Sequence, residues 1–261
     1  MPDLKINDMS VDDRRKKILE LLNREGKVKV VDLSRLFGIS EVTIRNDLSE
    51  LENTGVLERV HGGAVSTGKA YYNMSFHDRM KTNEDEKRKI AIEVASLISD
   101  GDTVMINSGT TTLFTVQELK GLKNLTIVTN SLSVAEEIGH FSNIHVILLG
   151  GNFNPQYQFT YGDDTINQLK RYKADKLILA ADGVSVEEGI TTYHHLEVEV
   201  NRQMIARVNK TIVVVDYTKI GRAGFARIDS LDSIDLLVSN QNSNQNEIAL
   251  IREKGIEIRL V

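Results

Sequence analysis

The sequence predicts an α/β protein in two parts, an N-terminal winged helix-turn-helix domain and a larger domain built on a mostly parallel sheet. Two short apolar helix patterns meet at Gly38, and a strand pattern with a glycine-pair turn follows them. Six short apolar runs then alternate with helical patterns between residues 103 and 238. We expect the first domain at residues 1–66, a linker at 67–82 and the second domain at 83–261. The length of 261 residues allows each domain a core of its own.

The N-terminal domain begins with three expected helices that share one small core. The first, at about residues 12–24, supplies Ile18, Leu21 and Leu22. The apolar residues of the other two repeat at helical spacing on either side of Gly38: Val30, Leu33, Leu36 and Phe37 before it, and Ile44, Leu48 and Leu51 after it. Gly38 can end the second helix in the left-handed conformation, and Ser40 can cap the third. The spacing is typical of a helix-turn-helix.

The third helix and the turn that follows the next strand carry the candidate DNA contacts. Because Ile44 and its apolar partners face inward, polar side chains remain on the faces that would enter a major groove. Arginine and asparagine can each make two hydrogen bonds to a base edge there. A strand at 56–60 and a tight turn after it would reach the phosphate backbone. The expected contacts are Ser40, Glu41, Thr43, Arg45, Asn46, Ser49, Arg59, His61 and Gly62. The alternative interpretation is a solvated helical hairpin within a larger domain.

The charge distribution limits how such a domain could bind DNA. The chain has a formal net charge of -5, and residues 1–65 carry 11 basic and 12 acidic side chains. DNA binding must therefore rest on where the charges lie and not on their sum. The basic run at 14–17 is a candidate phosphate contact, and its alternative is a solvated helix face.

Composition excludes several other classes of site. The absence of cysteine excludes disulfides and thiolate metal sites. There is neither an apolar run of membrane-spanning length nor a signal peptide pattern, and we expect a cytoplasmic protein without contact to a membrane. We also expect no cofactor and no metal, since the adjacent His194 and His195 point apart and no third ligand has suitable spacing.

The second domain begins where the chain regains a regular pattern. Residues 66–81 show no periodicity, whereas Asn83 and the three acidic residues after it are typical of a helix start. The strand candidates are 103–106, 125–129, 145–149, 176–180, 211–216 and 235–238. Continuous apolar runs separated by helices indicate a largely parallel sheet covered on both faces.

Ligands of such a sheet bind beyond the carboxyl ends of its strands, and here those positions carry small or polar residues. The hydroxyl-rich segment 108–112 opens a helix, whose free N–H groups and dipole favour a phosphate. Lys219 would add a cation, while Asp182 or Asn130 would take hydroxyls of a phosphorylated polyol. The expected effector contacts are Asn107, Ser108, Gly109, Thr110, Thr111, Thr112, Asn130, Ser131, Gly150, Gly151, Asp182, Gly183, Glu199 and Lys219. Taken singly, these residues could merely cap a helix or turn the chain.

Residues 43–48 and 59–64 resemble the signature of the DeoR family of bacterial sugar-metabolism regulators, and the similarity runs nearly end to end. The second domain resembles the family's sensor domain, which is similar in fold to ribose-5-phosphate isomerase and hexosamine-phosphate deaminase. The matching segments of that domain are 108–111, 129–131, 150–151, 182–183 and 216–219. The resemblance implies a DNA-binding repressor of a carbohydrate catabolic operon, with a sugar-phosphate-sensing domain and a phosphorylated sugar as effector.

The chain departs from the family pattern at three positions. Family members more often have a basic residue at Asn46, commonly have aspartate at Asn107 and often have lysine at Asn201. The first departure bears on base preference and the other two on ligand choice. A finer similarity joins the chain to the amino-sugar branch that contains the N-acetylgalactosamine regulators, and it implies an amino-sugar phosphate. It rests on residues 110–112, 158–163 and 199–202.

A second hypothesis is a sugar-phosphate isomerase or deaminase with a DNA-binding appendage. Glu199 is its best candidate base, because isomerisation needs a carboxylate near the reacting proton. Glu197 and Glu199 could equally be acids that favour a helix start. Since no acid/base pair is evident, we expect a regulator and not an enzyme. One helix-turn-helix buries too little surface for tight binding, so a homo-oligomer, either a dimer or a tetramer, is expected on double-stranded operator DNA.

Overall fold

The computed structural model describes residues 9–25, 27–53, 57–66 and 74–261. The chain forms two compact units, Met1–Met74 and Ser75–Val261. Each unit has its own apolar core. None of the described helices combines the length and the apolar character that crossing a membrane requires.

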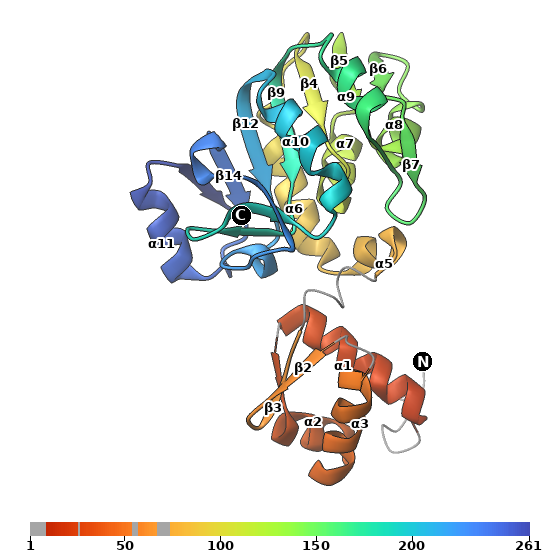
Figure 1. Ribbon diagram of the computed structural model, residues 1–261, viewed down its shortest axis with the longest axis vertical. Helices are drawn as coiled ribbons and strands as arrows, with labels where there is room; N and C mark the ends of the chain where they lie inside the picture. Colours follow the sequence, from red (N-terminus) through yellow and green to blue (C-terminus); the bar gives the residue numbers. More distant parts are fainter. Residues whose placement is uncertain (1–8, 26, 54–56, 67–73) are drawn as a thin grey trace. The chain divides into compact units, whose positions relative to one another are not determined.

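The first unit is a winged helix-turn-helix, as the sequence predicts (Figure 1). Its three short strands pair antiparallel in the order β1-β3-β2 beside three helices. The elements are α1 Val11–Glu25, β1 Lys27–Lys29, α2 Val30–Phe37, α3 Glu41–Asn53, β2 Leu57–Val60 and β3 Gly63–Ser66. The expected core residues Ile18, Leu33, Phe37, Ile44 and Leu48 are buried together. Leu36 is the exception, since 45% of it is exposed.

Glycines and one serine fix the two turns of this unit. Gly38 ends α2 with a φ of 66°, and the Ser40 hydroxyl accepts a hydrogen bond from the Thr43 N–H at 3.1 Å. In the wing turn Gly62 has a φ of 78°, and a Cβ on Gly63 would lie 2.0 Å from the Val28 carbonyl oxygen. The glycine pair thus allows β3 to pack against β1, two strands that the sequence pattern does not reveal. The predicted first strand residue, Val56, lies outside the described residues.

The basic run at 14–17 is partly committed to an internal contact. Arg14 and Arg15 donate from their Nε atoms to the two carboxylate oxygens of Asp47, at 2.7 and 3.1 Å. Asp47 is buried in α3, so this double ion pair fastens α1 to the helix that carries the expected base contacts. The prediction of phosphate contact for this run is therefore not supported for Arg14 and Arg15. Lys17 pairs with Glu20 on the exposed side of α1.

The second unit is built on a seven-stranded sheet in which every neighbouring pair is parallel. The strand order is β15-β14-β12-β9-β4-β5-β6. The strands are β4 Thr103–Ile106, β5 Leu125–Thr129, β6 Ile144–Leu148, β9 Ala174–Ala180, β12 Val208–Val214, β14 Leu236–Ser239 and β15 Glu257–Leu260. The first six match the strands expected from the apolar runs, within a few residues at their ends. The edge strand β15 is not among them.

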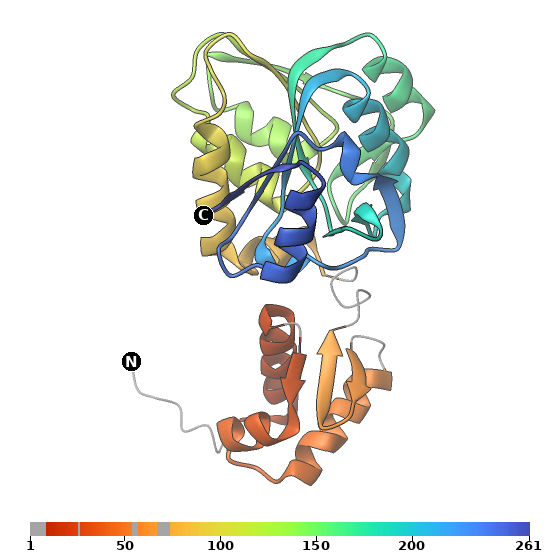
Figure 2. The ribbon, with the colours of Figure 1, turned by 90° about the vertical axis from the view of Figure 1, so that its left-hand side faces the viewer.

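Helices cover both faces of this sheet, as the continuous apolar strands predict. One face packs on α6 Glu84–Ala95, α7 Thr110–Glu118 and α8 Leu132–Ile138. The other face packs on α9 Asp163–Leu169, α10 Val198–Ile205 and α11 Gln245–Glu253. Figure 2 shows the gold helix α6 and the teal helix α10 on opposite sides of the strands. Successive residues of β4 point alternately into the two layers, with Val104 in one and Met105 in the other.

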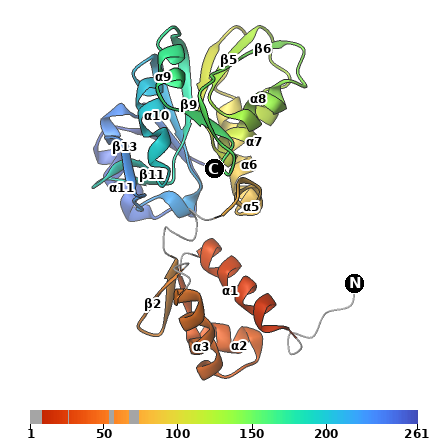
Figure 3. The same cartoon turned by 45° about the vertical axis from the view of Figure 1, so that its right-hand side comes forward.

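Several short elements that the sequence pattern does not reveal accompany the large sheet. Five short strands form two small antiparallel sheets: β7 Asn152–Asn154 with β8 Phe159–Tyr161, and β10 Gly183–Ser185 with β11 Gly189–Thr192 and β13 Ala226–Asp229. Three other elements are 3-10 turns, η2 His195–Glu197, η3 Tyr217–Lys219 and η4 Leu231–Ser233. The helix α5 Phe76–Lys81 lies in the segment expected to be linker, next to α6 (Figure 3). Residues 67–73 of that segment lie outside the described residues.

We predict that Asp47→Ala destabilises the first unit by about 2 kcal/mol, because it removes two charge-assisted hydrogen bonds. The measurement is hydrogen exchange of the full chain, read by mass spectrometry on peptides from residues 11–53. Asp32→Ala is the matched control, since Asp32 makes only an exposed pair with Arg35 at 4.0 Å and should change the unfolding free energy little. Equal protection in the two variants would show that the double ion pair contributes nothing.

Candidate functional site

The order of the large sheet reverses between β4 and β9. From β4 the chain proceeds outward to β5 and β6, and it then returns to β9 and proceeds the other way. The carboxyl ends of these two strands form the switch point at which open parallel sheets bind ligands. Asn107 joins them: its Nδ2 donates to the Ala180 carbonyl at 2.9 Å, and its Oδ1 accepts from the Ala180 N–H at 2.8 Å. Its predicted role as an effector contact is thus accompanied by a role in holding the rim together.

The segment after Asn107 leads into helix α7 at this rim. A Cβ on Gly109 would lie 2.5 Å from the Ala180 Cβ, so only glycine lets the loop approach β9 so closely. The Thr112 hydroxyl donates back to the Asn107 and Gly109 carbonyls at 3.0 and 2.9 Å. The hydroxyls of Thr110 and Thr111 make no hydrogen bond to any described residue. They stand at the first turn, where backbone N–H groups have no partner within the helix.

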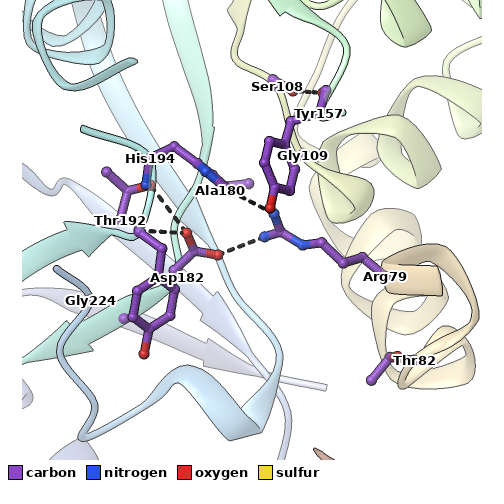
Figure 4. Close-up of polar contacts among 12 residues, drawn as sticks. Arg79, Thr82, Ser108, Gly109, Tyr157, Ala180, Asp182, Thr192, His194 and Gly224 are labelled. Carbon is purple, nitrogen blue, oxygen red and sulfur yellow. Dashed lines mark hydrogen bonds and ion pairs between the residues drawn. The ribbon is translucent and has the colours of Figure 1, made fainter. Parts of the chain in front are cut away.

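A charged cluster that the sequence pattern does not reveal lies beside this loop (Figure 4). Arg79 of α5 donates from Nη2 to Asp182 Oδ1 at 2.6 Å, and its Nη1 lies 3.1 Å from His194 Nε2. The His194 ring packs against the Tyr157 ring at a tilt of 45°, with centroids 3.8 Å apart, and the Tyr157 carbonyl accepts from the Ser108 hydroxyl at 3.1 Å. One chain of contacts therefore connects α5, the end of β9 and the loop that opens α7.

The protonation states in this cluster follow from burial and from the neighbouring charges. Asp182 is buried, which opposes its charge, but Arg79, Lys219 and the Tyr193 N–H at 2.9 Å lower its pKa to about 2. Burial lowers the pKa of His194 to about 4, so its ring is neutral at pH 7 and accepts a hydrogen bond from Arg79. The tautomer follows from that contact, with Nε2 as the acceptor.

Glu197 is a second carboxyl group in the same network, and it is neutral. Burial and the charge of Asp182 raise its pKa to about 8. The Thr192 hydroxyl lies 3.1 Å both from Asp182 Oδ2 and from Glu197 Oε1. The single proton of that hydroxyl is shared between the two carboxyl groups, and the Thr192 hydrogen bond opposes the rise in the pKa of Glu197. Glu197 Oε2 is buried and has no partner among the described residues.

Lys219 and Asp216 extend the cluster beyond β12. Burial lowers the pKa of Lys219 to about 8, against the opposing charges of Asp216 and Asp182. Lys219 and Lys87 lower the pKa of Asp216, which also accepts from Asn83 Nδ2 at 3.3 Å. Among the described residues of this cluster, the buried cations Lys87 and Lys219 and the largely buried Arg79 thus outnumber the buried anions Asp182 and Asp216 by one at pH 7. A buried excess of positive charge favours an anionic ligand.

Most of the remaining expected effector contacts follow the ends of β5, β6 and β9. The Asn130 Nδ2 donates to the Thr160 carbonyl at 3.0 Å, and its Oδ1 is buried without a partner in the described part of the chain. Ser131 caps α8. The Gly150 N–H donates a hydrogen bond to Gln168 Oε1 at 3.1 Å. Side chains at Gly151 and Gly183 would overlap neighbouring atoms, so these two glycines allow close packing.

The structure separates the two glutamates at the start of α10. Glu199 is exposed, and its carboxylate lies 3.2 Å from Gln203 Nε2 and 3.9 Å from Arg202, on the outer face of the helix. It does not join the charged cluster, whereas Glu197 does. Asn201 is fully buried, and its Oδ1 accepts from Asn107 while its Nδ2 has no partner among the described residues. The sequence predicts no effector contact at Arg79, Glu197 or His194. Glu197 and His194 come shortly before the matched segment 199–202, whereas no sequence signal points to Arg79.

The expected DNA contacts lie on α3, in the turn before it and in the wing of the first unit. Arg45 is exposed and pairs with Glu41 at 2.6 Å, one helical turn away. Such an exposed pair is weak, and Arg45 can leave it for a base. Asn46 is exposed beside it, and Ser49 is half-buried further along α3. In the wing, Arg59, His61 and Gly62 are exposed, and the Arg59 N–H donates to Glu52 at 2.8 Å.

Comparisons with known proteins agree with both halves of this arrangement. Residues 14–70 match the family described as the DeoR-like helix-turn-helix domain, and residues 82–241 match the DeoR C terminal sensor domain. The HTH-type transcriptional regulator GolR of Listeria innocua is 34% identical to the chain, over 95% of the chain and 98% of that protein. The glycerol-3-phosphate regulon repressor of Escherichia coli is 29% identical, over 97% of the chain and 100% of that protein.

Among solved structures, ribose 5-phosphate isomerase A of Methanocaldococcus jannaschii is similar to part of the chain. Its TM-score is 0.39 and its sequence identity 19%, with 52% of this chain and 54% of that chain covered.

The raised pKa of Glu197 predicts a pH dependence of stability. The pKa of Glu197 is about 8 in the folded chain, whereas a glutamate in the unfolded chain has a pKa of 4.5. The contribution of Glu197 to stability is full below pH 4.5 and is lost as the pH rises through about 8. Glu197→Gln keeps the shape of the side chain and removes its ionisation. We expect the Tm of this variant minus the Tm of wild type to increase from pH 5 to pH 8. Thermal unfolding across this range checks it, with Glu199→Gln as control. A Tm difference that does not change with pH would mean that Glu197 is ionised in the folded chain.

Proposed function

Because the chain belongs to the DeoR family of transcriptional regulators, we propose that it represses a carbohydrate catabolic operon and leaves its operator when it binds a phosphorylated sugar. The observation that carries the proposal is the buried excess of positive charge at the switch point, beside the first turn of α7. Lys219, Arg79 and the free N–H groups of that turn supply donors for a phosphate. Asp182 and the unpaired Oδ1 of Asn130 supply acceptors for sugar hydroxyls.

The finer identity of the effector is also a proposal. The similarity of residues 110–112, 158–163 and 199–202 to amino-sugar regulators favours an amino-sugar phosphate. The unpaired buried atoms of Glu197 and Asn201 favour a ligand that brings further polar groups to this end of α10. A thermal-shift panel of ribose-5-phosphate, glucosamine-6-phosphate and galactosamine-6-phosphate, with the free sugars as controls, would identify it.

The regulator acts by binding its effector and not by converting it. The curated relatives above are named as a regulator and a repressor. The candidate base of the enzyme hypothesis, Glu199, faces away from the charged cluster. A regulator needs only that the effector bind the DNA-bound and DNA-free arrangements with different affinity. We further propose a homo-oligomer, because paired half-sites require at least two helix-turn-helix units.

We predict that Arg45→Ala abolishes specific operator binding and leaves the fold and effector binding unchanged. Loss of a bidentate base contact costs about 1 to 3 kcal/mol per site, and a dimer would lose it twice. The measurement is fluorescence anisotropy at fixed salt, on an operator fragment selected from random DNA and on a scrambled fragment. Arg252→Ala, which removes an exposed arginine of α11, is the control. Unchanged preference for the operator would place the base-reading surface elsewhere.

The charge of Lys219 predicts how effector affinity depends on pH. A sugar phosphate becomes a dianion above a pKa of about 6, and Lys219 loses its proton as the pH rises through about 8. Calorimetry should therefore give the highest affinity between these two values and a decline above pH 8. Lys219→Met should weaken binding and remove the decline at high pH. If the unphosphorylated sugar binds as tightly as its phosphate, the effector is not recognised through phosphate.

A further inference from the structure

Helix α5 joins the ligand rim to the DNA-binding unit along the chain. It begins at Phe76, two residues after the first unit ends at Met74. Its Arg79 side chain reaches Asp182, a residue 103 positions further along the sequence, at 2.6 Å. Arg79 is largely buried in this contact, and Asp182 almost fully so. One side chain thus ties the segment that leads to the DNA-binding unit to the rim of the sheet.

We propose that Arg79 couples effector binding to operator binding by exchanging Asp182 for the effector's phosphate, so that α5 shifts when the effector binds. The inference rests on the proposed function, because it requires an anionic effector at this rim. It assigns to Arg79, besides its contact with the phosphate, a role in transmitting effector binding to α5.

The chemistry of the two partners allows the exchange. A guanidinium group offers a planar fork of donors that matches a phosphate, and a phosphate dianion attracts it more strongly than a single carboxylate. Asp182 remains stabilised without Arg79. Its Oδ2 accepts from the Tyr193 N–H at 2.9 Å and the Thr192 hydroxyl at 3.1 Å, and the charge of Lys219 also acts on it.

The attachments of α5 explain why a change at Arg79 would move the helix. At its C-terminal end the buried Lys87 of α6 donates from Nζ to the carbonyls of Arg79 and Thr82, at 2.5 and 2.6 Å. At its N-terminal end the Phe76 side chain is buried. The Arg79 side chain is the attachment that ends on Asp182 and His194 of the ligand rim. An effector can shift the position of α5 only through a contact that differs between two arrangements, and the Arg79 contact meets that condition.

The experiment measures the coupling apart from effector affinity. The probe is whichever of ribose-5-phosphate, glucosamine-6-phosphate and galactosamine-6-phosphate gives the wild-type chain the largest Tm shift. Operator affinity is measured by anisotropy with no probe and with the probe at a concentration that calorimetry shows to be saturating for each variant. We expect the wild-type operator Kd to rise by about 5- to 150-fold. With Arg79→Ala it should rise less than about twofold.

Two controls make the result specific. Arg259→Ala removes an arginine that makes only partly exposed ion pairs with Glu93 and Glu257, and it should keep the wild-type ratio. Hydrogen exchange of the wild-type amides 76–82 should change when the probe is added, which tests the shift of α5 without any substitution. The proposal is overturned if Arg79→Ala keeps the wild-type ratio, or if exchange at 76–82 does not respond. Failure of every probe to bind the wild-type chain would instead refute the phosphorylated effector, and the coupling role with it.

Discussion

The pair of hydrogen bonds between the Asn107 side chain and the Ala180 backbone is the contact on which the site depends. It joins the ends of β4 and β9 where the strand order reverses, so that the loop opening α7 and the loop carrying Asp182 lie side by side. The close approach of Gly109 to Ala180 reinforces it. A parallel sheet brings the carboxyl ends of all its strands to one edge, and this topology brings residues that are distant in sequence together here.

Because these charged residues lie close together, each one affects the protonation state of the others. Burial opposes every charge in the cluster, and each group responds according to its neighbours. Asp182 and Asp216 stay ionised because cations surround them, whereas Glu197, beside Asp182, stays neutral. The cluster therefore keeps more cations than anions within a chain whose net charge is -5. Position also distinguishes the arginines of the first unit. Arg14 and Arg15 pair with the buried Asp47, whereas Arg45 makes only an exposed pair with Glu41.

Sequence reasoning predicted the elements with strong local patterns and missed those that depend on distant partners. The helix-turn-helix and six strands of the large sheet follow from apolar periodicity. The helix α5 does not, because it is short and its Arg79 is fixed by residues more than 100 positions away. Glu197 and Glu199 both read as acids at a helix start. Which of them faces inward is decided by the 3-10 turn His195–Glu197, and the sequence carried no signal for that turn.

The central claim is that the cations of the switch point bind a sugar phosphate through its phosphate group. The most direct measurement is a phosphorus-31 NMR pH titration of the bound sugar phosphate, with wild type and with Lys219→Met. Neighbouring cations favour the dianion, so we expect the second pKa of the bound phosphate to lie below its free value of about 6. In Lys219→Met it should return toward that value. A bound sugar phosphate whose phosphorus signal and pKa match those of the free compound would contradict the claim.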